Sequence, residues 1–433
     1  MPVSPSRGER SLRRQGTQMR LVEGDTSAAP APPARPAGRR MVFLSPEVLR
    51  WARESRGYSV EEAATKFGVD LTRMGDIEEG RKGLTPAQAG KLADIYKRPL
   101  AVLLLQKPLL EPPLLHDFRR VMGTDEGVAP SSDIRLALRR ARRAQTVSLE
   151  LITSMNQEAD FKIPQLSRDE DPTHAAGLLR EALGGPGTNA RARDAAESLR
   201  IWRDLVERLN VLVLQFSAAV SDARGFCLPG EKMPVIALNR SDSAEARSFT
   251  LFHELVHAAL RRDGICEPYE SATAQRSPPP DVVEQFCNAV SGRFLVPADK
   301  LRAEFQDSRP DAPPSDQQIQ AAARRLFVSR SVILRRLLDE GLINDSQYRS
   351  KLPHPTNQEE LPRRPAQGGG GNAITLKFGE WGRRYTQLVL QADAEGLIEP
   401  GEFSDYLELK LRSKEAIARL AFHERPAFHP RRE

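Results

Sequence analysis

The chain has 433 residues, which allows two to four domains at a usual size of about 100 to 200 residues each. It holds three cysteines, too few for a disulfide framework, and it lacks a run of about 18 apolar residues, so these counts argue against a disulfide-rich secreted protein and a membrane-spanning protein. The net charge of +6 excludes little, because one basic tail could supply all of it. We therefore expect a cytoplasmic protein with no membrane partner.

Residues 1–41 form a tail rich in Arg, Pro, Ala and Ser with almost no apolar periodicity. Such a composition cannot bury enough apolar surface to offset the loss of chain entropy, so we predict disorder. Two interpretations stay open. The tail is a basic arm that touches nucleic acid, or it is an upstream extension of a gene whose functional start is Met41. The second is slightly favoured, because a typical domain opens directly after Met41.

Residues 42–107 carry the start and stop signals of several short helices. Ser59 followed by Glu62 is a capping box, Gly68 predicts a tight turn, and Gly80 ends the next helix. A helix, a turn that contains glycine and a second helix inside a small all-α unit together predict a helix-turn-helix domain.

Three local features of this unit are the segment Trp51-Ala52-Arg53-Glu54, the spacing from Ala63-Ala64 to Gly68, and the segment Ile77-Glu78-Glu79-Gly80. In these features the unit resembles the Cro/cI-type (XRE) family. The resemblance implies DNA binding, with Thr72 and Arg73 in the recognition helix as contacts. An alternative stays open, because acidic residues near this helix weaken its attraction to phosphates and favour a domain that binds protein. These residues are Asp70, Asp76, Glu78 and Glu79.

Residues 108–131 are a Pro-rich linker, and residues 132–158 predict a long amphipathic helix with a basic cluster. We expect this cluster to be a solvated face, although it could meet acidic protein or nucleic acid. The cluster consists of Arg135, Arg139, Arg140, Arg142 and Arg143. Further helices at 171–183 and 195–209 lead into a small predicted sheet, whose strands span residues 211–216, 224–228 and 235–239.

The next predicted helix contains His253-Glu254-Leu255-Val256-His257 inside an apolar run from residue 249 to residue 260. On a helix of about 3.6 residues per turn, His253 and His257 leave the same face one turn apart and can bind one metal ion. Glu254 lies about 100° away around the helix, so it can reach a metal-bound water without being a ligand. Two histidines and a carboxylate are costly to bury there unless something binds them, so the pattern predicts a zinc-peptidase site rather than a chance match.

A catalytic zinc usually has three protein ligands, so we expect a third donor downstream. Glu284 is the best candidate, because it lies on a second apolar helix, within residues 283–297, that would face the first. The alternative for Glu284 is an ordinary solvated carboxylate, in which case the connecting loop supplies the ligand. The rivals in that loop are Asp263, Cys266, Glu267 and Glu270.

Three features extend this pattern: the run Arg247-Ser248-Phe249-Thr250-Leu251-Phe252 before the first histidine, a later Glu-x-x-(small)-Asn motif, and a Leu-x-Pro ending. With them the region resembles the ImmA/IrrE-type metallopeptidases, which are bacterial and phage regulators. The resemblance implies that His253, His257 and Glu284 hold the metal and that Glu254 is the catalytic base. Zn²⁺ fits these donors, and Mn²⁺ tolerates them too. The expected partner is a protein substrate, in particular a transcriptional repressor.

Two details of the peptidase site stay open in the sequence. The group that stabilises the oxyanion could be Tyr269, Arg262 or His174. An extended substrate could add to the small sheet, and we predict that its backbone runs along residues 224–239.

After the second metal helix the chain stays helical. Residues 301–350 have the outline of a second helix-turn-helix-like unit, whose apolar residues favour packing on the peptidase over the reading of bases. Residues 351–372 are a linker that ends in four glycines. Residues 373–423 predict two more helices, around 381–394 and 402–420, for which we expect partner docking or homo-oligomer formation.

The predicted fold is multidomain and mainly α with a small β-sheet (α+β), with the helix-turn-helix domain at 42–107 and the metallopeptidase domain at 132–300. Two functions compete. The first is a regulatory metallopeptidase that cuts one protein and is localised on DNA by its helix-turn-helix domain. The second is a DNA-binding regulator, or antitoxin-like protein, whose peptidase-like domain binds metal or partner with little turnover. Glu254 favours the first, because a site that only binds metal has no need of it.

Overall fold

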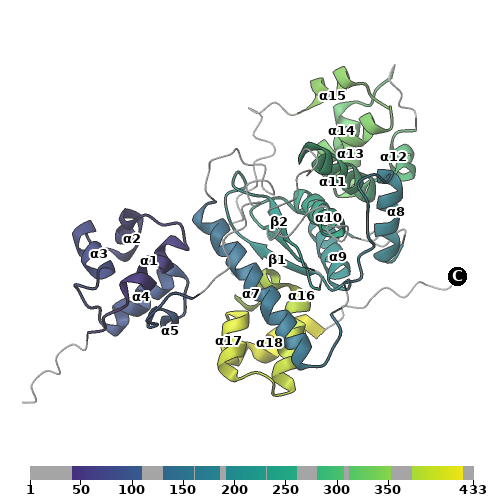
Figure 1. The fold of residues 1–433 in the computed structure, drawn as a ribbon. Coiled ribbons are helices and arrows are strands. Elements are labelled where there is room, and N and C mark those ends of the chain that lie inside the picture. The colour runs from purple at the N-terminus through teal and green to yellow at the C-terminus, as the bar shows by residue number, and fades with distance from the viewer. Residues whose placement is uncertain are drawn as a thin grey trace, which may run out of the picture.

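The computed structural model describes residues 41–109, 130–159, 161–185, 192–230, 232–260, 280–306, 312–352 and 373–422. The predicted fold class is confirmed, because these residues form mostly α-helices around a three-stranded sheet (Figure 1). The tail before Met41, most of both predicted linkers and the loop with the rival ligands lie outside them. Within the described ranges, no helix is long and apolar enough to cross a membrane.

The helix-turn-helix unit is formed by α1 (Pro46–Glu54), α2 (Val60–Phe67), α3 (Leu71–Glu78), α4 (Pro86–Tyr96) and α5 (Leu100–Leu103). The predicted capping box of Ser59 and Glu62 starts α2, and Gly68 ends it in the left-handed conformation at φ 82°. Asp70 caps α3 by accepting a hydrogen bond from the backbone N–H of Arg73. The caps define the turn between α2 and α3, and the helices close over an apolar core of their own.

A sheet buried on both faces lies at the centre of the molecule (Figure 1). Its strand order is β1-β3-β2, with β1 parallel and β2 antiparallel to β3. Alternate strand residues point to opposite faces, so Leu212 and Leu214 pack with α7 while Val213 and Ile236 pack with α8 to α11. The elements are α7 (Ser132–Ser154), α8 (Pro172–Ala182), α9 (Ala195–Glu207), β1 (Leu212–Phe216), β2 (Gly225–Leu228), β3 (Val235–Asn239), α10 (Ala244–Leu260) and α11 (Pro280–Leu295).

This topology corrects the predicted path of a substrate along residues 224–239. β3 is the central strand, and its backbone groups pair with β1 on one side and with β2 on the other. Residues 235–239 are therefore closed to a substrate strand, because strand addition needs a sheet edge.

The predicted second helix-turn-helix-like unit contains α12 (Ala298–Glu304), α13 (Asp316–Leu326), α14 (Arg330–Asp339) and α15 (Asp345–Lys351). α13 ends at Phe327 in the left-handed conformation and Ser329 caps α14, which repeats the turn between α2 and α3. Val332 of α14 is 7% exposed, whereas Arg73, at the same position of α3, is exposed. α14 thus buries a face that α3 leaves open, which supports packing over the reading of bases.

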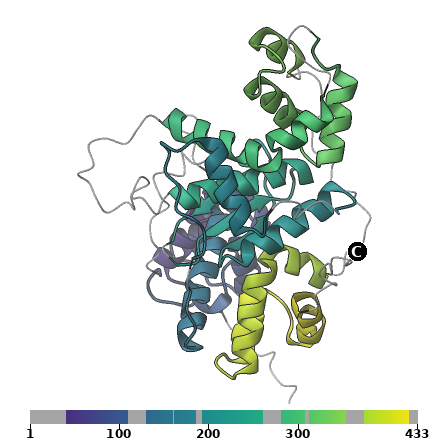
Figure 2. The same cartoon turned by 90° about the vertical axis from the view of Figure 1, so that its right-hand side faces the viewer.

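The C-terminal region contains α16 (Ala373–Ala394), α17 (Pro400–Leu407), the 3-10 helix η3 (Leu411–Ser413) and α18 (Lys414–Phe422). The prediction of two helices is wrong in two details. α16 begins at Ala373 rather than near residue 381, and the second helix is divided, because Glu408 ends α17 in the left-handed conformation. In both views this region lies at the opposite end of the central part from α13 to α15 (Figures 1 and 2).

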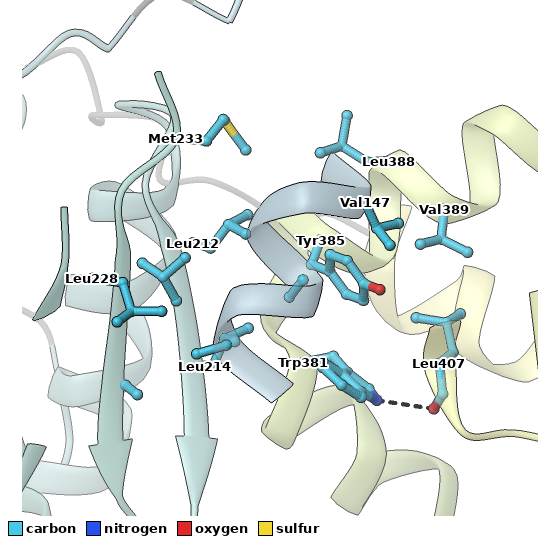
Figure 3. Packing of buried hydrophobic residues seen from close by; sticks show 14 of the residues in the cluster. Val147, Leu212, Leu214, Leu228, Met233, Trp381, Tyr385, Leu388, Val389 and Leu407 are labelled. Atoms are coloured by element: carbon cyan, nitrogen blue, oxygen red, sulfur yellow. Dashed lines mark hydrogen bonds between the residues drawn. The ribbon is translucent and has the colours of Figure 1, made fainter. Parts of the chain in front are cut away.

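The apolar face of the C-terminal region is part of the central core (Figure 3). Trp381 and Tyr385 of α16 join Leu212 and Leu214 of β1 in one buried cluster, and the indole N–H of Trp381 donates to the carbonyl oxygen of Leu407 at 3.0 Å. Any partner docking by this region would therefore use its outer surface.

The basic cluster of α7 is only in part a solvated face, because Arg143 is exposed but other members make contacts. Arg139 donates to the carbonyl oxygen of Lys97 in the helix-turn-helix unit at 2.6 Å. Nε of Arg140 lies 2.9 Å from Oε1 of Glu408, and its guanidinium lies 5.1 Å from the ring centre of Trp381. The expectation is wrong for Arg139 and Arg140, because their partners are distant in the chain and helical periodicity carries no information about them. α7 joins the N-terminal, central and C-terminal parts.

α16 is broken at Gly382, which has φ 74° and ψ 173°. At the break, the carboxylate of Glu207 at the end of α9 accepts a hydrogen bond from the backbone N–H of Arg383 at 3.1 Å and so caps the second half of the helix. Burial raises the pKa of Glu207 to about 7. Arg203, one turn earlier on α9, donates to the carbonyl oxygen of Val213 in β1 at 2.9 Å. Gly382 and the buried carboxylate of Glu207 thus allow α16 to pack closely against the sheet.

Gly382→Ala is expected to detach α16 from the sheet. A Cβ atom there would overlap Oε1 of Glu207 and lie 2.7 Å from the carbonyl oxygen of Val213, in a backbone conformation that disfavours side chains. We expect the free energy of unfolding to fall by about 3 kcal/mol, measured by urea denaturation. Gly396→Ala is the matched control, because Gly396 has φ 70° but no atom within 4 Å of an added Cβ. It should lose only about 1 kcal/mol, and equal losses would contradict the predicted clash.

Candidate metal centre

α10 carries both predicted histidine ligands. Its apolar side chains are buried against the sheet and the neighbouring helices, which leaves one face for the polar groups. His253 and His257 lie on this face with 15% and 14% of their side chains exposed. Glu254, the next residue around the helix, is only 5% exposed. The buried apolar residues include Leu251, Phe252, Leu255 and Val256.

Glu284 of α11 completes the group. Its Oε2 lies 3.1 Å from Nε2 of His253, and its Oε1 lies 3.1 Å from Nε2 of His257. The two Nε2 atoms are 3.1 Å apart. The structure thus brings the three predicted ligands together, with donor atoms close enough to share one ion. The rival loop ligands and two oxyanion candidates, Arg262 and Tyr269, lie outside the described residues.

The electrostatics of this group favour a positive charge at its centre. Burial alone would raise the pKa of Glu284, but hydrogen bonds with His253 and His257 hold it well below its usual range. Burial would lower the pKa of His253, yet Glu284 and Glu254 raise it. A divalent metal would supply this positive charge in place of protons. Two imidazole nitrogens and a carboxylate are donors that Zn²⁺ accepts, so the residues fit the metal.

No role was predicted for Asn288, which the structure places beside His253. Asn288 follows Glu284 by four residues on α11, hence on the same face of the helix; burial would lower the pKa of His253, and Asn288 is one of the neighbours that raise it. The Glu-x-x-(small)-Asn motif contained this signal. His174, the oxyanion candidate that the described ranges include, is exposed in the first turn of α8.

α3 presents both predicted DNA contacts. Thr72 and Arg73 are exposed, and α3 lies on the side of its unit that points away from α7 (Figure 1). A nucleic acid can therefore approach these residues without meeting the central part of the molecule.

The acidic residues of α3 do not form an uncompensated negative surface. Glu78 is buried and accepts a hydrogen bond from Nε of Arg53 at 2.7 Å. Asp76 and Glu79 both pair with Arg81. The electrostatic argument for a protein-binding domain is thereby weakened, because Arg53 and Arg81 together compensate two of the four acidic charges within the unit.

Comparison with known families agrees with both parts of the structure. Residues 206–338 match the IrrE N-terminal-like domain, a peptidase family, and residues 47–105 match a helix-turn-helix domain. The chain combines a helix-turn-helix domain with an IrrE N-terminal-like domain. The two predicted resemblances are confirmed in their predicted order, which supports DNA binding and implies a metal. No curated protein matches the chain.

The IrrE-like match extends through α14, which helps to anchor the helix that carries Glu284. Arg336 of α14 is 1% exposed and donates from Nε to the carbonyl oxygen of Val296, just after α11, at 2.9 Å. Arg180 of α8 donates to the carbonyl oxygens of Arg293 and Phe294 at 2.9 and 2.5 Å. Guanidinium groups satisfy the last carbonyls of a helix and complement its dipole. These two arginines, which the sequence did not connect to the site, fix the end of α11.

His257→Ala and Glu284→Ala are each expected to weaken Zn²⁺ binding by at least about 100-fold, because each removes one of three protein donors. Competition with a chromogenic chelator measures the affinity. Glu245→Gln, in the first turn of the same helix α10, is the control and should bind Zn²⁺ like the wild type. Wild-type affinity in Glu284→Ala would mean that the third ligand is another residue.

Proposed function

We propose that this protein is a zinc-dependent regulatory peptidase that makes a site-specific cut in a protein partner, in particular a transcriptional repressor. The observation that carries the proposal is Glu254, a buried carboxylate directly after His253 on the metal helix. A centre that only binds metal has no need of a second acid in this place, whereas hydrolysis of a peptide bond needs a base beside the ion.

In this proposal His253, His257 and Glu284 hold the metal, which supplies a Lewis acid at the centre. Glu254 takes the proton of the attacking water and passes it to the leaving amine. Its low exposure limits competition from bulk water for the carboxylate. Asn288, one turn after Glu284 on α11, is proposed to help orient the imidazole of His253.

The substrate backbone is proposed to add to β2. β3 is paired on both sides, and the outer edge of β1 is approached by α16 at Gly382. β2 lies against the metal helix so closely that a Cβ atom on Gly225 would overlap Cγ2 of Thr250. Thr250 precedes His253 by less than one helical turn, so an extended peptide on β2 would run past the metal centre.

A second candidate function is a DNA-binding regulator, or antitoxin-like protein, whose IrrE-like domain binds metal or partner with little turnover. The exposed pair Thr72 and Arg73 favours the DNA-binding part, and the ion pairs of Glu78 and Asp76 reduce the negative charge near α3. Both candidate functions include a metal site and DNA binding. They differ in whether Glu254 acts on a substrate.

Glu254→Gln is expected to keep its metal and lose cleavage, because an amide of nearly the same volume cannot accept the proton. General-base catalysis contributes about 100- to 10,000-fold, so cuts should disappear on the time scale of the wild type. Metal-loaded proteins are incubated with lysate of the source organism, and new protein N-termini are identified by mass spectrometry. Glu245→Gln is the control and should cut normally. If wild type and Glu254→Gln produce the same N-termini, the proposed peptidase activity is contradicted and the second candidate is favoured.

Arg73→Ala is expected to weaken DNA binding by about tenfold, because it removes a guanidinium contact at the start of α3. The probe is a set of duplexes that the wild-type protein selects from a random library. Arg50→Ala, on the exposed side of α1, removes the same charge and should bind like the wild type. Failure to select any duplex, or unchanged binding by Arg73→Ala, would favour a protein-binding domain.

A further inference from the structure

The helix-turn-helix domain lies beside the N-terminal half of α7 (Figure 1). Arginine side chains make contacts between them. Nη2 of Arg139 in α7 donates to the carbonyl oxygens of Lys97 at 2.6 Å and Tyr96 at 3.4 Å. Lys97 ends α4 in the left-handed conformation at φ 51°, so these are the last carbonyls of the helix. The negative end of the α4 dipole therefore faces a guanidinium of α7.

A second contact runs from the helix-turn-helix domain to α7. Arg56 follows α1 and is 3% exposed; its Nη1 donates to the carbonyl oxygen of Ser132 at 2.7 Å, and its Nη2 lies 3.8 Å from the carboxylate of Asp133. The same Nη2 donates to the hydroxyl of Tyr58 at 2.9 Å. Arg56 is thus held by its own domain and reaches the first turn of α7 with the same planar group.

The helix-turn-helix domain and α7 make these contacts without a shared apolar core between them. The core of the helix-turn-helix domain runs from Leu44 to Leu103 in sequence, and the core that contains α7 begins at Ile134. Among the described residues, no buried apolar cluster contains side chains from both. α7 meets the C-terminal region differently, because apolar packing accompanies the pair of Arg140 and Glu408. An interdomain surface without a shared apolar core can exchange its polar bonds for bonds to water.

We propose that Arg56 and Arg139 form a releasable clamp, which holds the helix-turn-helix domain on α7 in one orientation and lets it swing free while it stays folded. α3 lies on the far side of the domain from α7 (Figure 1), so the DNA-facing helix is accessible in both states. The apolar side of α7 stays in the central core, so opening moves the helix-turn-helix domain and leaves the metal centre in place. The clamp does not depend on whether that centre hydrolyses a peptide.

The test compares the full-length wild type with Arg139→Gln and with the double variant Arg56→Gln/Arg139→Gln. Arg143→Gln is the control, because it removes the same charge from an exposed position of α7. Small-angle X-ray scattering gives the radius of gyration, and hydrogen exchange with mass spectrometry follows residues 93–98 and 131–136. The clamp variants should show a larger radius and exchange at least about tenfold faster in both segments, as expected when a bond to a charged group is lost. The control should match the wild type.

Exchange in α1 and α2 reports whether the helix-turn-helix domain stays folded. If the double variant loses protection there, Arg139→Gln alone decides, because Arg139 lies on α7 outside that domain. An unchanged radius and unchanged exchange in Arg139→Gln would overturn the proposal, since the contact would then not hold the domain. Equal changes in Arg143→Gln would overturn it as well, since the charge of α7 and not the contact would be responsible.

Discussion

The rest of the IrrE-like domain depends on one constraint: three polar side chains from two helices must meet at one point. His253, His257 and Glu284 place their donor atoms 3.1 Å apart, an arrangement that is costly in a half-buried site unless a positive charge compensates it. The distance is set by the packing of α10 on α11, where the rings of Phe252 and Phe294 lie 3.9 Å apart between centres. A slip of one residue along either helix would turn a ligand away from the centre, so contacts beyond the centre must hold this register.

The layers around the sheet follow from the need to bury both of its faces. Helices on one side cover the face toward α10, and Leu212 and Leu214 on the other face are covered by α7 and α16. Both of these helices lie outside residues 206–338, which match the peptidase family. Without α16 an apolar face of the sheet would be exposed to solvent, which would favour aggregation. Gly382 lets α16 fit closely enough to prevent this, so the C-terminal region is a layer of the fold rather than an appendage.

The sequence was sufficient to predict features that depend on a few neighbouring residues. The metal helix and the capping box of α2 are two such features. Glu284 is an intermediate case, because apolar spacing identified its helix but rival carboxylates remained until the fold placed it. Long-range features could not be predicted. The helix break at Gly382 requires the carboxylate of Glu207 from another element, and the charge of Glu78 vanishes from the surface only because Arg53 lies beside it in space. Periodicity reports which face of a helix is apolar, but not which distant group will meet its polar side.

The two sides of α7 determine how the DNA-facing domain and the metal centre can influence each other. One side, with Leu138 and Ala141, is buried in the central core, and moving it would expose side chains worth about 1.5 to 3 kcal/mol each for the larger ones. The other side meets the helix-turn-helix domain through Arg139, and opening it only exchanges protein bonds for bonds to water. The helix-turn-helix domain therefore moves before α7 does, and the distances between the metal ligands are insulated from its position. For the proposed peptidase, DNA binding would therefore act by raising the local concentration of a DNA-bound substrate near the centre, and not by distorting the centre.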